Sequence, residues 1–314
     1  MVNDMRSQCP PVAIFGFNRP DCLIQVFERV RMARPKQLFL VLDAPRLKHP
    51  DDIHQWESCK KIFEMVDWDC EVHRNFATEN LGCRWRMTTG ISWVFEHVDR
   101  ALLLEDDCVP HSDFFRFCGE LLERYKDDMR IGMIAGHIAH LERIPCDTSY
   151  YFDRFNAIWG WATWRRSWES FDKAMDSWPQ FKQKGNLKTA LGSNHLTKVV
   201  TEIFDDVYVG KRDSWATAWF YSCIHQNLLC IHPAVNLITN VGVVGAHNSG
   251  RTRIHFIPSN GISFPLIHPT EVVPSFSDEK AMQRYYSRPS FWKRVVWFAY
   301  RTLKKFVIVD MCKK

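Results

Sequence analysis

The sequence predicts an α/β fold in which a mostly parallel sheet is flanked by helices. Two observations support this class. Short, continuous apolar runs alternate with amphipathic segments of helical period, as expected for strands buried between two layers of helices. The chain has 314 residues, of which 46% are hydrophobic, so it can form a large core.

The alternation of strand and helix is clearest before residue 137. Residues 11–17 indicate a buried strand, and Pro20 suits the first turn of the helix that follows. A second apolar run, 37–43, completes a β-α-β unit whose strands should be parallel. Further strands are predicted at 70–76, 100–107 and 130–136, and further helices at 50–66, 84–98 and 112–128.

The pattern is weaker in the second half of the chain. Residues 150–172 are aromatic and irregular and then turn helical in pattern. The last part of the chain is rich in Pro and Ser over 261–288, which predicts a linker. Helices are predicted at 195–210 and 213–229, and strand and loop at 229–250.

The positive charge of the chain is concentrated at its C-terminal end. Residues 288–314 hold eight basic residues and one acid, a net of +7, so with a total of +5 the rest carries −2. The body is therefore not a nucleic-acid binder by charge. The tail, 289–314, mixes these basic residues with aromatic ones and is predicted to be an amphipathic helix on an anionic membrane surface. The alternative is a core helix with a solvated basic face.

The cysteine spacing and the N-terminal sequence predict the cellular location of the protein. None of the eleven cysteines forms a C-x-x-C pair, which argues against a zinc ribbon or a redox dithiol. The opening residues lack a signal peptide, and no apolar run is long enough to span a membrane. The expectation is a cytoplasmic protein, peripheral on the inner face of the membrane.

Three consecutive acids, Glu105, Asp106 and Asp107, directly follow the apolar run 101–104. Ligands bind outside the carboxyl ends of the strands in open α/β sheets. Hard oxygen ligands at such an edge suit Mn²⁺ or Mg²⁺, which usually bind one or two carboxylates together with substrate phosphates. The alternative is a solvated acidic turn that opens the next helix.

Other polar residues mark the same edge of the predicted sheet. Asn18 and Arg19 follow the first strand, and Asp43 ends the second. Together with the acids they would suit a nucleotide diphosphate and a metal. The sequence has no P-loop, and no G-x-G-x-x-G follows the first strand.

Several segments resemble, in order, those of GT-A glycosyltransferases, a Rossmann-like family. They are "PPVAIFGFNRP", "LVLDAPR", the stretch from "NLGCRWRM" to "LLLEDDCVPHSDFFRF", "WGWATWRRSW" and "RDSWATAWF". The resemblance is closest to the group of β-1,2-N-acetylglucosaminyltransferase I and its bacterial relatives, whose E-D-D is a form of the D-x-D metal motif. "CIHPAVN" and "NVGVVGAHNSG" match its later strand and glycine-rich loop. Arg212 and Ser214 stand where its acceptor motif has Trp and a second acid.

The resemblance implies an inverting transfer from a nucleotide-sugar, UDP-linked and possibly UDP-GlcNAc, with Mn²⁺. Asp107 would then bind the metal, and Asp106 and Glu105 would support the ribose or the metal's waters. Arg19 and Asp43 would hold the nucleotide.

The resemblance makes Asp213 the general base that takes the proton of the acceptor hydroxyl. By itself Asp213 could instead be the N-cap of the helix that follows. Asp205 and Asp206 lie nearby in the sequence and are alternative candidates for the base, but their position is more typical of acids at the end of a helix.

Three further residues are candidates for sugar or phosphate contacts. Trp161 would face the sugar or be core, His247 would line the site or be a solvated loop residue, and Arg84 would contact phosphate or sugar or pair with a helix acid.

The predicted organisation is a glycosyltransferase domain over 10–260, with a nucleotide-sugar half (10–150) and an acceptor half (151–260). The predicted activity is transfer of a hexosyl or N-acetylhexosaminyl group to a surface saccharide or lipid-linked acceptor. One alternative is a sugar-phosphate nucleotidyltransferase, which usually has a glycine-rich loop after its first strand. Another is a non-catalytic carbohydrate- or membrane-binding module.

Overall fold

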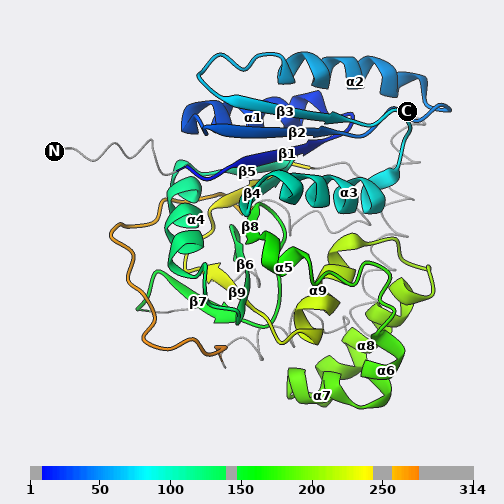
Figure 1. The fold of residues 1–314 in the computed structure, drawn as a ribbon, viewed down its shortest axis with the longest axis vertical. Coiled ribbons are helices and arrows are strands. Elements are labelled where there is room, and N and C mark those ends of the chain that lie inside the picture. Colours follow the sequence, from blue (N-terminus) through cyan, green and yellow to red (C-terminus); the bar gives the residue numbers. More distant parts are fainter. Residues whose placement is uncertain (1–8, 139–146, 243–256, 276–314) are drawn as a thin grey trace, which may run out of the picture.

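The protein is built around an eight-stranded sheet with helices on both faces (Figure 1). The computed structural model describes residues 9–138, 147–242 and 257–275. The strand order is β3-β2-β1-β4-β8-β6-β9-β7, and a second sheet of two strands pairs β10 with β5. The predicted α/β class is confirmed.

The first half of the chain follows the predicted alternation. β1 pairs in parallel with both β2 and β4, and β2 pairs in parallel with β3. The elements are β1 (Val12–Gly16), α1 (Pro20–Ala33), β2 (Gln37–Leu42), α2 (Pro50–Phe63), β3 (Glu71–Phe76), α3 (Gly82–His97), β4 (Arg100–Glu105), β5 (Cys108–Pro110), α4 (Ser112–Arg124) and β6 (Ile131–Ala135).

The central strands are apolar throughout because each face of the sheet is covered by its own helices. Val12 and Ile14 of β1 pack in one cluster with α1, α2 and α4. Ala13 and Phe15 point to the other face and pack in a second cluster with α3 and with α9 (Trp215–His225). Adjacent residues of a strand point to opposite faces, so a strand covered on both faces loses its polar positions.

The second half departs from the prediction for 150–172. This segment contains β7 (Tyr150–Asp153), β8 (Trp161–Trp164) and the short helix α5 (Arg165–Trp168). β8 lies between β4 and β6 and is antiparallel to both, and β9 (Leu229–Pro233) joins β6 in parallel and β7 in antiparallel orientation. All four residues of β8 are buried, so the segment shows no alternation of polar and apolar residues.

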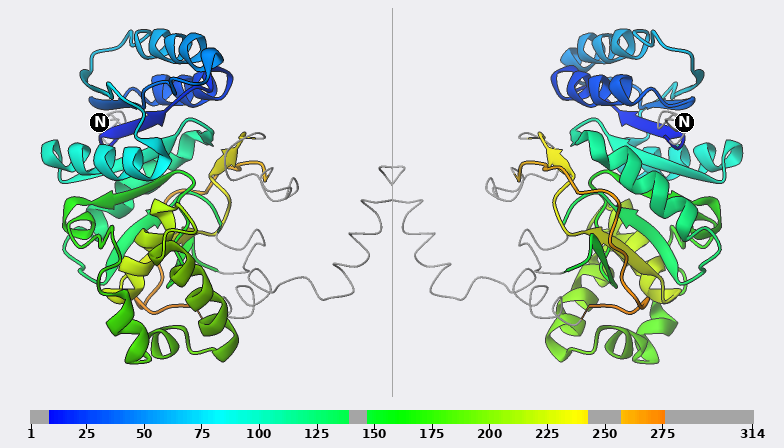
Figure 2. Two further views of the ribbon diagram at one scale, coloured as in Figure 1. Left: turned by 90° about the vertical axis from the view of Figure 1, so that its right-hand side faces the viewer. Right: turned by 90° about the vertical axis from the view of Figure 1, so that its left-hand side faces the viewer.

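Four helices share a further layer: three lie at the end of the molecule opposite α1 and α2 (Figure 2), and the fourth, α9, also packs against the sheet. They are α6 (Trp178–Gln183), α7 (Asn186–Leu191), α8 (Asn194–Tyr208) and α9, and they share an apolar cluster that contains Trp178, Phe204 and Tyr221. This layer carries the loop before α9, which holds Asp213.

Residues 257–275, which include the described part of the predicted linker, pack against the main domain. The backbone of Ile267 accepts a hydrogen bond from Ser149 N at 2.8 Å, and Leu266 is buried. The rest of the predicted linker and the tail, 289–314, lie outside the described residues. Among the helices that are described, none has the length and hydrophobicity to cross a membrane.

Candidate active site

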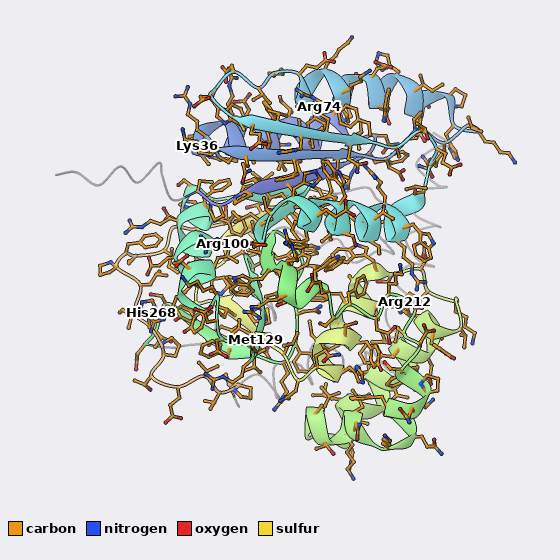
Figure 3. All side chains as sticks on the ribbon, viewed as in Figure 1. Lys36, Arg74, Arg100, Met129, Arg212 and His268 are labelled. Atoms are coloured by element: carbon orange, nitrogen blue, oxygen red, sulfur yellow. The ribbon has the colours of Figure 1, made fainter. Side chains whose placement is uncertain are left out.

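The site lies where the connections of the sheet change direction. From β1 the chain adds β2 and then β3 on one side, and it then returns to place β4 on the other side of β1. Such a switch point leaves a crevice at the carboxyl ends of the strands, where α/β proteins bind ligands. Lys36 and Arg100, which flank the amino ends of β2 and β4, lie on the left side of Figure 3, whereas Arg212 lies on the right. The carboxyl ends of β2 and β4 therefore lie on the side of Arg212.

Arg19 is the positive group that stabilises the acidic triplet. It follows β1, and the acids end β4, so parallel pairing of these strands brings the two loops together. Its guanidinium forms an ion pair with Asp106, to which Nε also donates at 3.3 Å, and its Nη1 donates to Asp107 Oδ2 at 2.8 Å. The Arg19 side chain is 29% exposed and that of Asp106 only 4%. The structure thus brings together four of the predicted residues.

Burial and mutual repulsion shape the protonation of the triplet. Burial raises the pKa of Glu105, and the charges of Asp107 and Asp106 raise it further, against the opposing effect of Arg19. Burial also raises the pKa of Asp106, although Arg19 holds it down. Burial by itself would lower the pKa of Arg19, but its two aspartates outweigh this and raise it. Arg19 therefore stays charged, and the pKa values of Glu105 and Asp106 are both shifted upward.

The donor atoms at the triplet fit a hard divalent cation. Asp107 is 15% exposed at the crevice, and its Oδ1 is contacted by the Cys108 thiol at 3.4 Å. Within the described residues no three His, Cys, Asp or Glu side chains are grouped to hold a metal. Mg²⁺ and Mn²⁺ need only one or two carboxylates when phosphates and waters complete the shell. Asp107 would hold such an ion, with the remaining ligands coming from the substrate.

Gly242 is a site residue that the sequence did not reveal. The pairing of β10 (Ile238–Asn240) with β5 carries the chain over the triplet, and Val241 N donates to the Asp107 carbonyl at 2.8 Å. A Cβ at Gly242 would lie 2.3 Å from Asp107 Oδ2 and 3.0 Å from Arg19 Nη1. A larger residue at this position would have to displace the Asp107 or Arg19 side chain. The sequence shows Gly242 as the first glycine of "NVGVVG". Its closeness to Asp107 could not be predicted, because it depends on the pairing of β10 with β5.

Asp43 lies at the same edge, but its carboxylate accepts hydrogen bonds from the protein's own backbone and from one side chain. Oδ1 accepts from Leu81 N at 2.9 Å and Ala44 N at 3.0 Å. Oδ2 accepts from Gly82 N at 3.0 Å and from Asn80 Nδ2 at 3.2 Å. The residue is 4% exposed, and burial raises its pKa against these hydrogen bonds. Asp43 thus fixes the start of α3, the helix that carries Arg84.

Arg84 joins α3 to the loop that holds Asp213. Its Nη1 lies 3.8 Å from Asp213 Oδ1, and its Nη2 donates to the Lys173 carbonyl at 3.0 Å. Asp213 has a side chain that is 69% exposed. The N-cap of α9 is Ser214, whose Oγ accepts from Thr217 N at 3.2 Å. The alternative that Asp213 is the cap is therefore wrong, and its carboxylate is directed to Arg84 and solvent.

Asp213 is electrostatically close to the acidic triplet. Cys83, at the start of α3, has a thiol whose pKa is raised to about 12, first by burial and then by the charges of Glu105, Asp213 and Asp106. One thiol is thus within electrostatic reach of both groups of acids. Asp205 is elsewhere engaged, since it accepts from Trp178 Nε1 at 3.0 Å and from Lys182 Nζ at 2.7 Å.

Trp161, another of the predicted residues, is not part of this constellation. Trp161 is 1% exposed and lies within 6.0 Å, centroid to centroid, of the rings of Trp215 and Trp219. Its position is that of a core residue, the alternative that the sequence left open, and its ring has no surface to offer to a sugar. His247 lies outside the described residues.

No family model and no curated protein matches this chain. Among solved structures, an apo UDP-glucose pyrophosphorylase is similar at TM-score 0.38 and 8% identity over 71% of this chain and 90% of that one. Mouse xyloside xylosyltransferase 1 is similar at 0.35 and 10%, over 70% and 83%. The 4-diphosphocytidyl-2C-methyl-D-erythritol synthase from Anaerococcus prevotii is similar at 0.34 and 11%, over 71% and 88%. At this identity the likeness carries nothing about chemistry.

Proposed function

We propose that this protein is a metal-dependent, inverting glycosyltransferase that moves a sugar from a UDP-sugar to a hydroxyl group of a saccharide acceptor. The observation that carries the proposal is the Arg19–Asp106–Asp107 cluster at the strand ends, accompanied by the exposed carboxylate of Asp213 beside Arg84 of α3. Arg19 and Asp107 would serve the diphosphate and its metal, and Asp213 would serve the acceptor. The inversion at the anomeric carbon and the choice of UDP as the nucleotide come from the family resemblance of the sequence.

The donor side would work by charge neutralisation. When bound at Asp107, Mn²⁺ would neutralise the departing diphosphate. Arg19 carries a fork of N–H donors that suits phosphate as well as carboxylate. Burial of Asp106 and Glu105 keeps these groups fixed, so that a ribose hydroxyl or a coordinated water would meet oriented acceptors.

The acceptor side would work by general-base catalysis. Asp213 is exposed, so an acceptor hydroxyl can reach it, and Arg84 limits the orientations of its carboxylate. The 3.8 Å separation leaves room for the carboxylate to accept a proton without first breaking a short ion pair. In this proposal the acceptor oxygen forms a bond to the anomeric carbon as its proton moves to Asp213. The bond from the anomeric carbon to the diphosphate oxygen breaks, and UDP leaves with that electron pair.

The experiment is an acceptor-dependent transfer assay with the full chain, UDP-sugars, Mn²⁺ and a panel of saccharide acceptors. UDP and a glycosylated product should form together, with an inverted anomeric configuration. Formation of a UDP-sugar from sugar phosphate and UTP would instead identify a nucleotidyltransferase. Donor binding without turnover against any acceptor would point to the non-catalytic module.

The matched variants are Asp213→Asn and Asp206→Asn. Loss of a general base lowers the rate by about 10²- to 10⁴-fold, so Asp213→Asn should lose at least about 100-fold in transfer and keep its affinity for the UDP-sugar. Asp206→Asn makes the same chemical change near the end of α8 and should remain active. Full activity of Asp213→Asn would remove this residue from the mechanism.

A further inference from the structure

Arg19 bridges the two aspartates of the acidic triplet. Its guanidinium pairs with Asp106 on one side and with Asp107 on the other. Both carboxylates are poorly exposed, with 4% and 15% of the side chain accessible. The negative charge of the aspartates is thus largely compensated before any ligand arrives.

The surroundings of Asp107 leave little freedom for a cation to avoid Arg19. Asp107 Oδ2 accepts from Arg19 Nη1 at 2.8 Å and lies under the backbone of Gly242, where even a Cβ would be 2.3 Å away. A divalent ion at Asp107 would therefore lie within a few ångströms of a guanidinium that shares the same carboxylate. Two cations at that distance repel strongly, and partial burial weakens the screening by water.

A diphosphate offers Arg19 another partner. The guanidinium fork pairs with phosphate oxygens as readily as with a carboxylate, and the charge of a diphosphate exceeds that of one aspartate. Arg19 follows β1 and faces the crevice with 29% of its side chain exposed, so a phosphate in the crevice can contact it.

We propose that Arg19 is an internal counter-ion which a divalent cation can displace only when a diphosphate arrives with it. The diphosphate takes over the guanidinium, Asp107 is released, and the cation binds between Asp107 and the phosphates. This inference rests on the proposed function. It predicts that the metal and the nucleotide bind to the donor site cooperatively. Coupling between two ligands is reciprocal, so each strengthens the other by the same factor.

The test measures Mn²⁺ binding to the full chain by calorimetry, without and with UDP, and needs no turnover. The wild-type protein should bind Mn²⁺ weakly alone and at least about tenfold more tightly with UDP. Arg19→Gln removes the competing charge, so it should bind Mn²⁺ alone at least about tenfold more tightly than wild type, and UDP should add less. Asp107→Asn should abolish both effects.

The matched control is Arg31→Gln, which removes one positive charge from the same helix at its pair with Asp67. It should leave Mn²⁺ binding unchanged. Because Arg19→Gln leaves buried carboxylates unpaired, the double variant Arg19→Gln/Asp106→Asn provides a second test in which charge and partner are removed together. It should also bind Mn²⁺ alone more tightly than wild type.

Two outcomes are separable. Equal Mn²⁺ affinities of wild type and the Arg19 variants would overturn the counter-ion role, as would Mn²⁺ binding to wild type that is not strengthened by UDP although UDP binds. Failure of UDP and UDP-sugars to bind any of the proteins would instead contradict the proposed function. The comparison with Mn²⁺ alone would then still decide whether Arg19 competes with the cation.

Discussion

Replacement of Asp43 by alanine should destabilise the protein strongly, because this carboxylate organises the loop before α3. It accepts hydrogen bonds from three backbone N–H groups and one side-chain amide. A hydrogen bond to a charged group contributes about 1.5 to 3 kcal/mol, and a buried donor left without a partner costs about 1 to 3 kcal/mol. The residue is only 4% exposed, so burial of the carboxylate opposes the gain and raises its pKa.

Taken together, these effects lead us to expect a loss of about 2 to 4 kcal/mol for Asp43→Ala. For a protein of this size that corresponds to a fall in Tm of roughly 3 to 6 °C. The measurement is urea unfolding followed by circular dichroism. The control is Asp51→Ala, an exposed acid in the first turn of α2, which should cost less than about 1 kcal/mol.

The result that would refute this reasoning is a loss no larger than that of Asp51→Ala. Asp43→Asn sharpens the test, because it keeps one oxygen for Leu81 and Ala44 but places an amide where Gly82 and Asn80 donate. It should be less stable than wild type. A residue that only contacted a nucleotide would lower UDP affinity in both variants without lowering stability.

Three further changes have expected outcomes. Trp161→Ala should cost about 3 to 5 kcal/mol of unfolding free energy, as for other buried aromatics, whereas Trp161→Phe should leave sugar binding intact; a loss confined to sugar affinity would refute its core position. In metal-free protein, the unfolding free energy of Glu105→Gln should exceed that of wild type by more at pH 7 than at pH 5, as measured by urea unfolding. The folded pKa of Glu105 is raised, so its contribution to stability is lost as pH rises from the ordinary carboxyl range through that raised pKa. Removal of residues from Pro289 onward should weaken binding to anionic liposomes at about 1 kcal/mol per basic residue and leave UDP binding unchanged; equal liposome binding would refute the tail prediction.

The sequence alone determined the class of the fold and the edge of the sheet that carries the site. Apolar runs without polar positions identified the strands β1, β2 and β4, because strands covered on both faces tolerate few polar side chains. The polar residues that follow these runs had to meet at one edge, since parallel strands end on the same side. Arg19 and the acids Asp106 and Asp107 were found in this way. The antiparallel β8 was missed because a fully buried strand of four residues has no alternation to detect.

Only the tertiary structure decided what each polar residue contacts. Asp43 and Asp106 are both buried acids at strand ends, yet one caps a helix through backbone N–H groups and the other pairs with Arg19. The approach of Gly242 to Asp107 depends on the pairing of β10 with β5, which joins segments about 130 residues apart. The burial of Trp161 likewise depends on the packing of α9 across the sheet. Sequence pattern reports the period of burial along one element, whereas these contacts depend on how separate elements are brought together.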